Sequence, residues 1–508
     1  MPSQKTEGFD PTDPFSTNQA GEKRQATLGK RLTRRELLKL GAGVAGLAAL
    51  AGCAPSSPPA ASPTSAPPAA AAPAAAPTTA PAAAAPAAPA TVSSTGSTFD
   101  WKRFKGQTVN ALLVVASYTD TRKSHFSEFE DLTGIKLNVD IVPEQQQRQK
   151  QIIEFTSGNP SFDVTDESWH VTKGLFGKGK WLLDLRDMIK DPNMTSPDFD
   201  FADFTKGAVT YATQPDGSLD TIPLAVDQWI LYWNKELFAK KNLKAPTTLD
   251  EMVAAAKELN DPANRISGFA ARGLKNANTP VWTAFMQGWN VDSIDSNNVM
   301  HTNGPEAIAA AQIYQTLLSK YAPAGVNGFN WMECQASFQQ GATAMWFDGI
   351  GFTAPVEDPS KSRVVGKVGY ALQPAGPKGH YSAMFGNGIG ITAKSKNVGP
   401  AWYFCQWYTQ KKFNVAMLQT GAGSPVRTST YQDPQATQNL KVPQEWVTTL
   451  LESQKIGRPG LPAIIPVTEF RDTFGIALTN MISGADPKSE LDKATEQFKP
   501  ILEKSLTS

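Results

Sequence analysis

Cysteine, histidine and net charge are all scarce in this chain. Its 508 residues include three cysteines and four histidines, and 48 basic side chains against 47 acidic ones leave a net charge of +1. A balanced charge gives no long-range attraction to nucleic acid. The histidines and cysteines show no spacing typical of metal ligands. The sequence therefore predicts no nucleic-acid partner, no metal site and no cofactor.

Sequence motifs of nucleotide-binding and hydrolytic enzymes are missing as well. The glycines of Gly386–Gly390 (GNGIG) are followed by neither a helix start nor a Walker lysine, so they do not predict a phosphate-binding loop. There is no G-x-S-x-G motif of a serine hydrolase. These absences favour a protein that is not an enzyme.

Long hydrophobic runs are absent except near the N-terminus. Leu40–Ala51 is apolar over about a dozen residues, whereas a membrane-spanning helix needs about 20. It follows Arg34, Arg35 and Lys39 and is followed by Gly52 and Cys53. A basic start, a short apolar run and small residues are typical of an export signal.

Two details of this segment resemble known signals. Residues 33–39 (TRRELLK) resemble the twin-arginine export signal, and residues 50–53 (LAGC) resemble the bacterial lipobox, in which the cysteine is acylated. We therefore expect residues 1–53 to be a twin-arginine lipoprotein signal with Cys53 as the lipidated residue; general secretion remains the alternative route. Two or more acyl chains anchor a protein stably, which one chain does not.

Residues 54–100 are rich in alanine and proline and predict a disordered tether, because they have few large apolar groups to bury. About 410 residues remain, which is the size of two domains. Besides Cys53 they contain Cys334 and Cys405. We expect two buried free thiols; a disulfide between them is the alternative.

Strand and helix patterns alternate through the rest of the chain. Thr108–Val115, Ile135–Val142 and Phe162–Thr165 predict strands, and Thr121–Thr133 and Gln145–Ser157 predict helices between them. This order is typical of βαβ units with a parallel sheet.

Later segments continue the mixed α/β pattern. Thr248–Glu251 is a capping box that begins a helix, Pro305 suits the first turn of another, and Val398–Gln419 predicts one long amphipathic helix. No obvious linker separates two consecutive halves, so the chain should cross between its domains.

Five short motifs follow one another along residues 105–503. They are Asn234–Phe238 (NKELF), Lys244–Glu251 (KAPTTLDE), Phe338–Trp346 (FQQGATAMW), Ser395–Phe404 (SKNVGPAWYF) and Gly421–Arg427 (GAGSPVR). In this order they resemble motifs of extracellular solute-binding proteins, the maltose-binding-like family of ABC importers. Residues 327–377 look most like its polyol or simple-sugar branch.

The resemblance implies a two-lobed α/β periplasmic-binding-protein fold of type II, in which each lobe is a mostly parallel sheet flanked by helices. It implies three hinge crossings, which we place near residues 223–228, 386–391 and 424–427. The first lobe would contain residues 101–223 and 390–422, and the second 228–385 and 428–508. The implied protein is a lipid-anchored monomer on the extracytoplasmic face of the cell membrane, which delivers a sugar or polyol to the permease subunits of an ABC importer.

Sugar and polyol recognition uses aromatic rings against C–H faces and charged or amide groups against hydroxyls. The candidate residues sit after the third strand, at the first crossing, after the A-M motif and at scattered tryptophans. They are Asp166, Glu167, Trp169, Asp227, Gln228, Trp282, Trp331, Trp346, Asp348, Asn387 and Arg427, with Arg272 as a further candidate. Gly349 and Gly351, next to Asp348, would let backbone approach a ligand closely.

Each candidate also has a structural interpretation. The acids could cap backbone amides, the tryptophans could pack in the core, and Arg427 could tie the third crossing together. Two other functions remain open. The same fold could bind a polyamine or another small solute. A secreted glycoside hydrolase would instead pair Asp348 with Glu167 or Asp227.

Overall fold

The computed structural model describes residues 99–507. The predictions for the export signal, including Arg34, Arg35 and Cys53, and for nearly all of the 54–100 tether lie outside the described residues. Within residues 99–507, no helix has the length and apolar character needed to cross a membrane.

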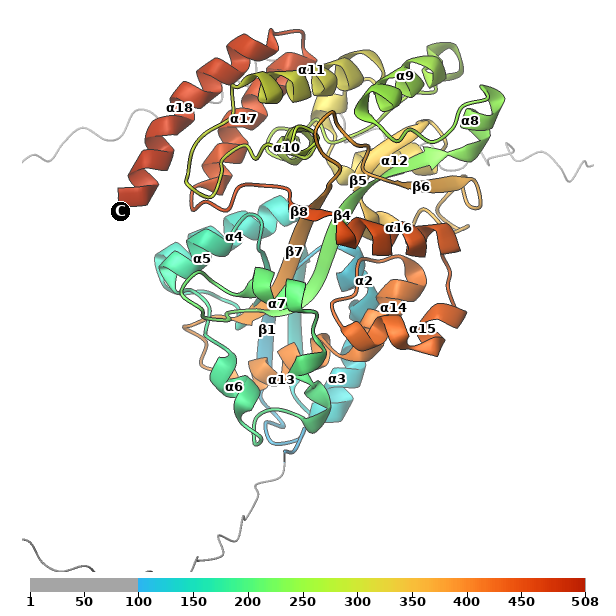
Figure 1. Ribbon diagram of the computed structural model, residues 1–508. Coiled ribbons are helices and arrows are strands. Elements are labelled where there is room, and N and C mark those ends of the chain that lie inside the picture. Colours follow the sequence, from blue (N-terminus) through green and yellow to red (C-terminus); the bar gives the residue numbers. More distant parts are fainter. Residues whose placement is uncertain (1–98, 508) are drawn as a thin grey trace, which may run out of the picture. The chain divides into compact units, whose positions relative to one another are not determined.

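Eight strands of the described part form one sheet (Figure 1). They are β1 (Thr108–Val114), β2 (Lys136–Val142), β3 (Val164–Ser168), β4 (Ile222–Asn234), β5 (Met345–Gly349), β6 (Val368–Leu372), β7 (Ser382–Ile391) and β8 (Gly457–Pro459). The strand order is β2-β1-β3-β7-β4-β5, with β6 also paired to β4 and β8 to β7.

Helices cover the sheet in a lower and an upper group in the view of Figure 1. The lower group and its flanks are α2 (Ser117–Lys123), α3 (Phe126–Thr133), α4 (Glu144–Ser157), α5 (Lys173–Gly179), α6 (Arg186–Lys190), α7 (Lys206–Ala212), α13 (Val398–Tyr408), α14 (Lys411–Thr420) and α15 (Pro434–Gln438). The upper group is α8 (Lys235–Lys240), α9 (Leu249–Leu259), α10 (Thr279–Gln287), α11 (Pro305–Lys320), α12 (Trp331–Gln339), α16 (Gln444–Lys455), α17 (Val467–Ile482) and α18 (Pro487–Thr507).

The hydrophobic core is divided in the same way. One large cluster joins β1, β3 and α13 and includes Trp402 and Phe404. Another joins α9, α10, α11, α17 and α18 and includes Trp282 and Phe474. Each group of helices thus buries its own apolar faces, which agrees with a two-lobed α/β fold.

Three chain segments lie side by side where the two halves meet. β4 and β7 pair antiparallel across this level, with Val226 opposite Gly386, and Val226 also bridges to Ser424. These are the segments in which the three crossings were predicted. The lobe boundaries themselves stay a prediction.

Strand direction differs from the prediction in the upper half. β1 pairs in parallel with β2 and β3, as the βαβ pattern predicted. β4, however, is antiparallel to β5, β6 and β7. The chain leaves the lower half on β4 and returns on β7, so these two strands run in opposite directions. The sheet is therefore mixed: β3 is also antiparallel to β7, and the short β8 is parallel to β7.

Two helices predicted as continuous are broken. The 121–133 segment is divided into α2 and α3, and the 398–419 segment into α13 and α14. The capping box of α9 at Thr248 and Glu251 is present, as predicted, and Gly134 ends α3 in the left-handed conformation. Cys334 and Cys405 are buried free thiols in different core clusters, as expected.

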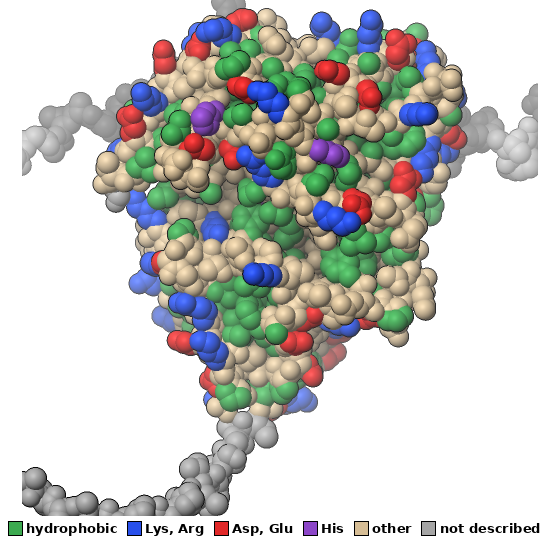
Figure 2. Space-filling view, viewed as in Figure 1, with side chains coloured by type: hydrophobic (Ala, Val, Ile, Leu, Met, Phe, Trp, Pro, Cys, Tyr) green, Lys and Arg blue, Asp and Glu red, His purple; other side chains and the backbone are tan. Residues whose placement is uncertain are grey.

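The surface carries both signs of charge. Figure 2 shows acidic and basic side chains over the upper and lower parts of one face, with hydrophobic side chains gathered across its middle. This distribution agrees with the balanced charge of the sequence.

Candidate ligand-binding site

A cavity of about 100 Å³ lies where the two halves meet. Both halves and the crossing strands contribute to its wall. Its charged lining groups are Glu144, Arg148, Asp227, Arg272 and Arg471, and its large aromatic ones are Tyr118, Trp229, Trp331, Phe352 and Phe385. Such a mixture of apolar walls and a few polar groups is typical of small-molecule sites.

Trp331 and Phe352 form a flat aromatic wall. Their rings are stacked, with centroids 4.7 Å apart and an interplanar angle of 8°. Trp331 is the first residue of α12, and at this helix start the Glu333 carboxylate accepts a hydrogen bond from the backbone N–H of Asn330 at 2.9 Å. The ring is therefore held by a rigid helix end, and a flat ring can cover the C–H face of a ligand.

Arg272 enters the cavity as half of a buried ion pair. Its Nε and Nη2 donate to the carboxylate of Asp348 at 2.9 and 2.5 Å. Asp348 is fully buried at the end of β5 and does not line the cavity. The guanidinium carbon lies 4.9 Å from the ring centroid of Trp229, which adds a cation–π contact. Asp348 therefore positions Arg272 rather than facing the cavity itself.

Asp227 lies on β4 in a space that glycines leave open. The backbone N–H of Gly351 donates to its Oδ1 at 2.8 Å. A Cβ at Gly349 would lie 1.8 Å from the Asp227 Oδ2, so no other residue type fits there without displacing the carboxylate. Burial, together with repulsion from Asp348, raises the pKa of Asp227 to about 7. The close approach predicted for a ligand at these glycines is thus made by a protein side chain.

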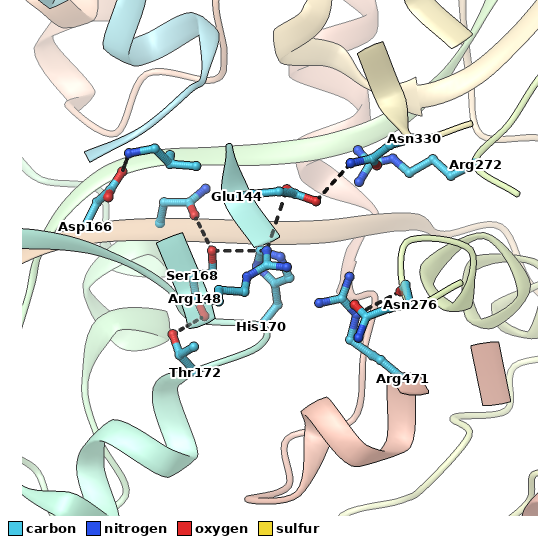
Figure 3. Close-up of polar contacts among 12 residues, drawn as sticks. Glu144, Arg148, Asp166, Ser168, His170, Thr172, Arg272, Asn276, Asn330 and Arg471 are labelled. Atoms are coloured by element: carbon cyan, nitrogen blue, oxygen red, sulfur yellow. Dashed lines mark hydrogen bonds and ion pairs between the residues drawn. The ribbon is translucent and has the colours of Figure 1, made fainter. Parts of the chain in front are cut away.

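Glu144 and Arg148 face the cavity from the first turns of α4 (Figure 3). Arg148 Nη2 lies 3.6 Å from the Glu144 carboxylate and donates to Ser168 Oγ at 3.5 Å. Asn330 Nδ2, from the upper half, donates to Glu144 Oε1 at 3.4 Å. The carboxylate of Glu144 therefore joins the two halves across the cavity.

Electrostatics keep Glu144 ionised. Burial alone would raise its pKa, but neighbouring guanidinium groups outweigh burial and lower the pKa to about 2. These groups belong to Arg148, Arg272 and Arg471. His170, also on the wall, has its pKa lowered well below its ordinary value, first by burial and then by Arg148, and is neutral.

Of the predicted residues, Asp227, Trp331, Asn387 and Arg272 line the cavity. The Asn387 Oδ1 accepts a hydrogen bond from Ser168 at 3.2 Å.

The predicted acids on β3 lie outside the cavity. Asp166 accepts hydrogen bonds from the Tyr118 hydroxyl at 2.9 Å and from the backbone of Val114 at 3.3 Å, so it fixes a tyrosine that does line the wall. Glu167 is fully buried with neither oxygen hydrogen-bonded, and burial raises its pKa well above the ordinary value. The side-chain Oε1 of Gln228 accepts a hydrogen bond from Ser424 Oγ at 2.5 Å, which links the first predicted crossing to the third.

Three predicted tryptophans are core residues. Trp169 Nε1 donates to Thr221 at 2.9 Å, Trp282 Nε1 donates to the Ala307 carbonyl at 2.9 Å, and Trp346 stacks on Tyr232 with ring centroids 4.5 Å apart. All three have at most 3% of their surface exposed.

Arg427 is also structural. It donates to the carbonyls of Thr409 and Phe199 and lies 3.4 Å from Asp203, which ties the third crossing to the lower half.

The sequence prediction missed Glu144, Arg148, His170, Trp229 and Arg471. Glu144 and Arg148 have the i, i+4 spacing of an ordinary exposed helix pair. Their position could have indicated the site. Both residues lie on the helix that follows β2, and ligands bind beyond the carboxyl ends of parallel strands. Among residues 99–507, no three His, Cys, Asp or Glu side chains are arranged to hold a metal ion.

Comparison with known proteins identifies relatives over most of the described chain. A family model described as bacterial extracellular solute-binding protein matches residues 116–414. An erythritol/L-threitol-binding protein of Mycolicibacterium smegmatis is 27% identical over 433 residues, which cover 79% of this chain and 87% of that protein.

Two solved structures are similar in fold. A solute-binding protein of Agrobacterium radiobacter K84 in complex with ribitol has a TM-score of 0.71 and 26% identity, and covers 78% of this chain and 99% of its own. One from Agrobacterium vitis S4 with bound D-mannitol has a TM-score of 0.70 and 23% identity, with the same coverage of both chains.

The buried ion pair predicts a large stability effect. Replacing Asp348 by Ala leaves the Arg272 charge buried without a partner, which should cost about 3–5 kcal/mol of unfolding free energy. Asp120→Ala, which breaks the exposed pair with Lys123, is the control and should cost less than about 1 kcal/mol. Chemical denaturation measures both. If both variants lost similarly little unfolding free energy, Asp348 would not be the counter-charge that stabilises buried Arg272.

The raised pKa of Asp227 predicts a pH dependence of stability. Between about pH 4 and pH 7 the carboxyl is protonated only in the folded state, so stability falls as pH rises through this window. Asp227→Asn removes this contribution. Without ligand, the thermal midpoint should therefore fall less for the variant than for the wild type between about pH 5 and pH 8. Burial also raises the pKa values of Asp166 and Asp220 to about 6, but both acids are present in the two proteins. Parallel pH profiles would therefore contradict the assignment to Asp227.

Proposed function

The chain belongs to the bacterial extracellular solute-binding protein family, and we propose that it captures a small polyol or sugar for an ABC importer. The observation that carries this proposal is one cavity, between the two halves, that combines the stacked wall of Trp331 and Phe352 with ionised groups. A ring wall suits C–H faces, and carboxylate and guanidinium groups suit hydroxyls.

Capture would proceed by closure of the two halves. The lobes we propose are residues 101–223 with 390–422, and residues 228–385 with 428–508. Ligand bound to one half would favour the closed state by adding contacts with the other. The hydrogen bond from Asn330 to Glu144 is one contact that closure would form. The closed protein would then dock on the permease subunits and release the solute.

Other functions fit the cavity less well. A polyamine would meet three guanidinium groups, those of Arg148, Arg272 and Arg471, and like charges disfavour its entry. A glycoside hydrolase of the predicted kind would pair Asp348 with Glu167 or Asp227. Asp348 is bonded to Arg272 and does not line the cavity, so neither pair is available there. Proteins of this family bind solutes for transport and are not enzymes.

We also propose how the protein is held at the membrane. Residues 1–53 would direct export by the twin-arginine route, Cys53 would carry lipid, and residues 54–100 would tether the monomer at the extracytoplasmic face of the cell membrane. The basis is the sequence pattern of residues 33–53.

The solute class is tested with a panel of polyols, sugars, amino acids and polyamines in thermal-shift and calorimetric titrations. We expect binding to be confined to polyols or sugars, and Trp331→Ala should weaken it by about tenfold or more, as loss of a buried aromatic contact predicts. Trp101→Ala, remote from the cavity wall, is the control and should leave affinity unchanged. Binding of an amine or amino acid alone would reject the proposal.

Anchoring is tested with Cys53→Ala. In the producing cell the variant should move from the membrane fraction to the soluble fraction or the medium, with polyol or sugar binding intact, because the acyl attachment site is lost. Immunoblotting of cell fractions measures this. A variant that stays in the membrane fraction would exclude Cys53 as the anchor.

A further inference from the structure

Basic side chains outnumber acidic ones on the cavity wall. Three guanidinium groups line it, those of Arg148, Arg272 and Arg471, against the two carboxyl groups of Glu144 and Asp227. Arg272 is neutralised from behind by Asp348. The remaining two arginines therefore share the carboxylate of Glu144, because Asp227 has its pKa raised to about 7, chiefly by burial, and is only partly ionised at neutral pH.

Arg471 is the less compensated of the two. Only 2% of its surface is exposed, and its Nε donates to the Asn276 carbonyl at 3.1 Å. It forms no ion pair with any carboxylate in residues 99–507. Burial, and then the nearby charge of Arg148, lower its pKa to about 9. A buried cation without an ion-pair partner is unfavourable, so an anion at this position would stabilise it.

Arg148 has unused hydrogen-bonding capacity. Its Nη2 reaches Glu144 and Ser168, but its Nε and Nη1 are buried with no hydrogen-bond partner. Figure 3 shows the Arg471 side chain, from the other half, reaching toward the side that carries Arg148 and His170. Neighbouring guanidinium groups with free N–H donors are suited to bind carboxylate or phosphate.

We propose that the ligand is an acyclic polyol with an anionic end, a carboxylate or a phosphate, held between Arg148 and Arg471. This rests on the proposed function and specifies its solute. The hydroxylated part of the chain lies against Trp331 with its hydroxyls at Glu144 and Asp227, and the charged end replaces the missing counter-ion.

The test compares matched neutral and anionic probes of four, five and six carbons by calorimetry: erythritol, ribitol and mannitol against their aldonates and their terminal phosphates. At low ionic strength, an aldonate or a phosphate should bind at least about tenfold more tightly than its neutral polyol, and high salt should reduce the difference. Comparing the two anionic series decides between carboxylate and phosphate.

Three arginine variants test which side chains cause the anion preference. Arg471→Gln and Arg148→Gln should each remove most of the anion preference, measured as a fall of about tenfold in the ratio of anionic to neutral polyol affinity. Arg186→Gln, at an exposed arginine of α6 that pairs with Asp184, removes the same charge outside the cavity and should keep the preference.

Two results would overturn the inference. One is a neutral polyol that binds as tightly as both of its anionic forms. The other is an anion preference that survives both cavity variants. In either case tight polyol binding would leave the proposed function intact, whereas failure of every polyol and sugar to bind would reject both. The wild-type comparison decides even if a variant does not fold.

Discussion

The pairing of β4 with β7 is the constraint on which the rest of this structure depends. These strands carry the chain out of the lower half and back, and their ladder joins two separately packed cores. They also place Asp227, Trp229, Phe385 and Asn387 on the cavity wall. Since the site is built on hydrogen-bonded strands and helix ends rather than on long loops, its geometry follows from the fold.

Much of the fold could be predicted from sequence because periodicity and turn residues are local signals. β1, α4 and the capped start of α9 lie within a residue or so of their predicted positions. Strand direction could not be predicted in this way, because a run of apolar residues has the same sequence pattern whether its strand pairs in parallel or antiparallel. The breaks between α2 and α3 and between α13 and α14 were also hidden, since both segments keep a helical pattern across the break.

The site was predicted less completely, and the reason lies in burial. Asp348 and Asp166 were predicted to contact ligand, yet neither lines the cavity. Each instead binds a residue that does: Asp348 binds Arg272, and Asp166 binds Tyr118. The tryptophans at 169, 282 and 346 are as aromatic as Trp331, and only the three-dimensional packing separates core from wall. Arginines within helical patterns are usually solvated, so Arg148 and Arg471 were missed, whereas Arg272 was among the predicted candidates.

The carboxylate of Asp227 occupies space that Gly349 and Gly351 leave empty. A side chain added at Gly349 would displace it, and a longer acid at position 227 would collide with the same backbone. Asp227 and Gly349 therefore constrain each other during evolution. Although more than a hundred residues separate Asp227 from Gly349, homologues that have lost the acid should be the ones free to replace this glycine, whereas Gly351 also lies against the backbone of Gly423.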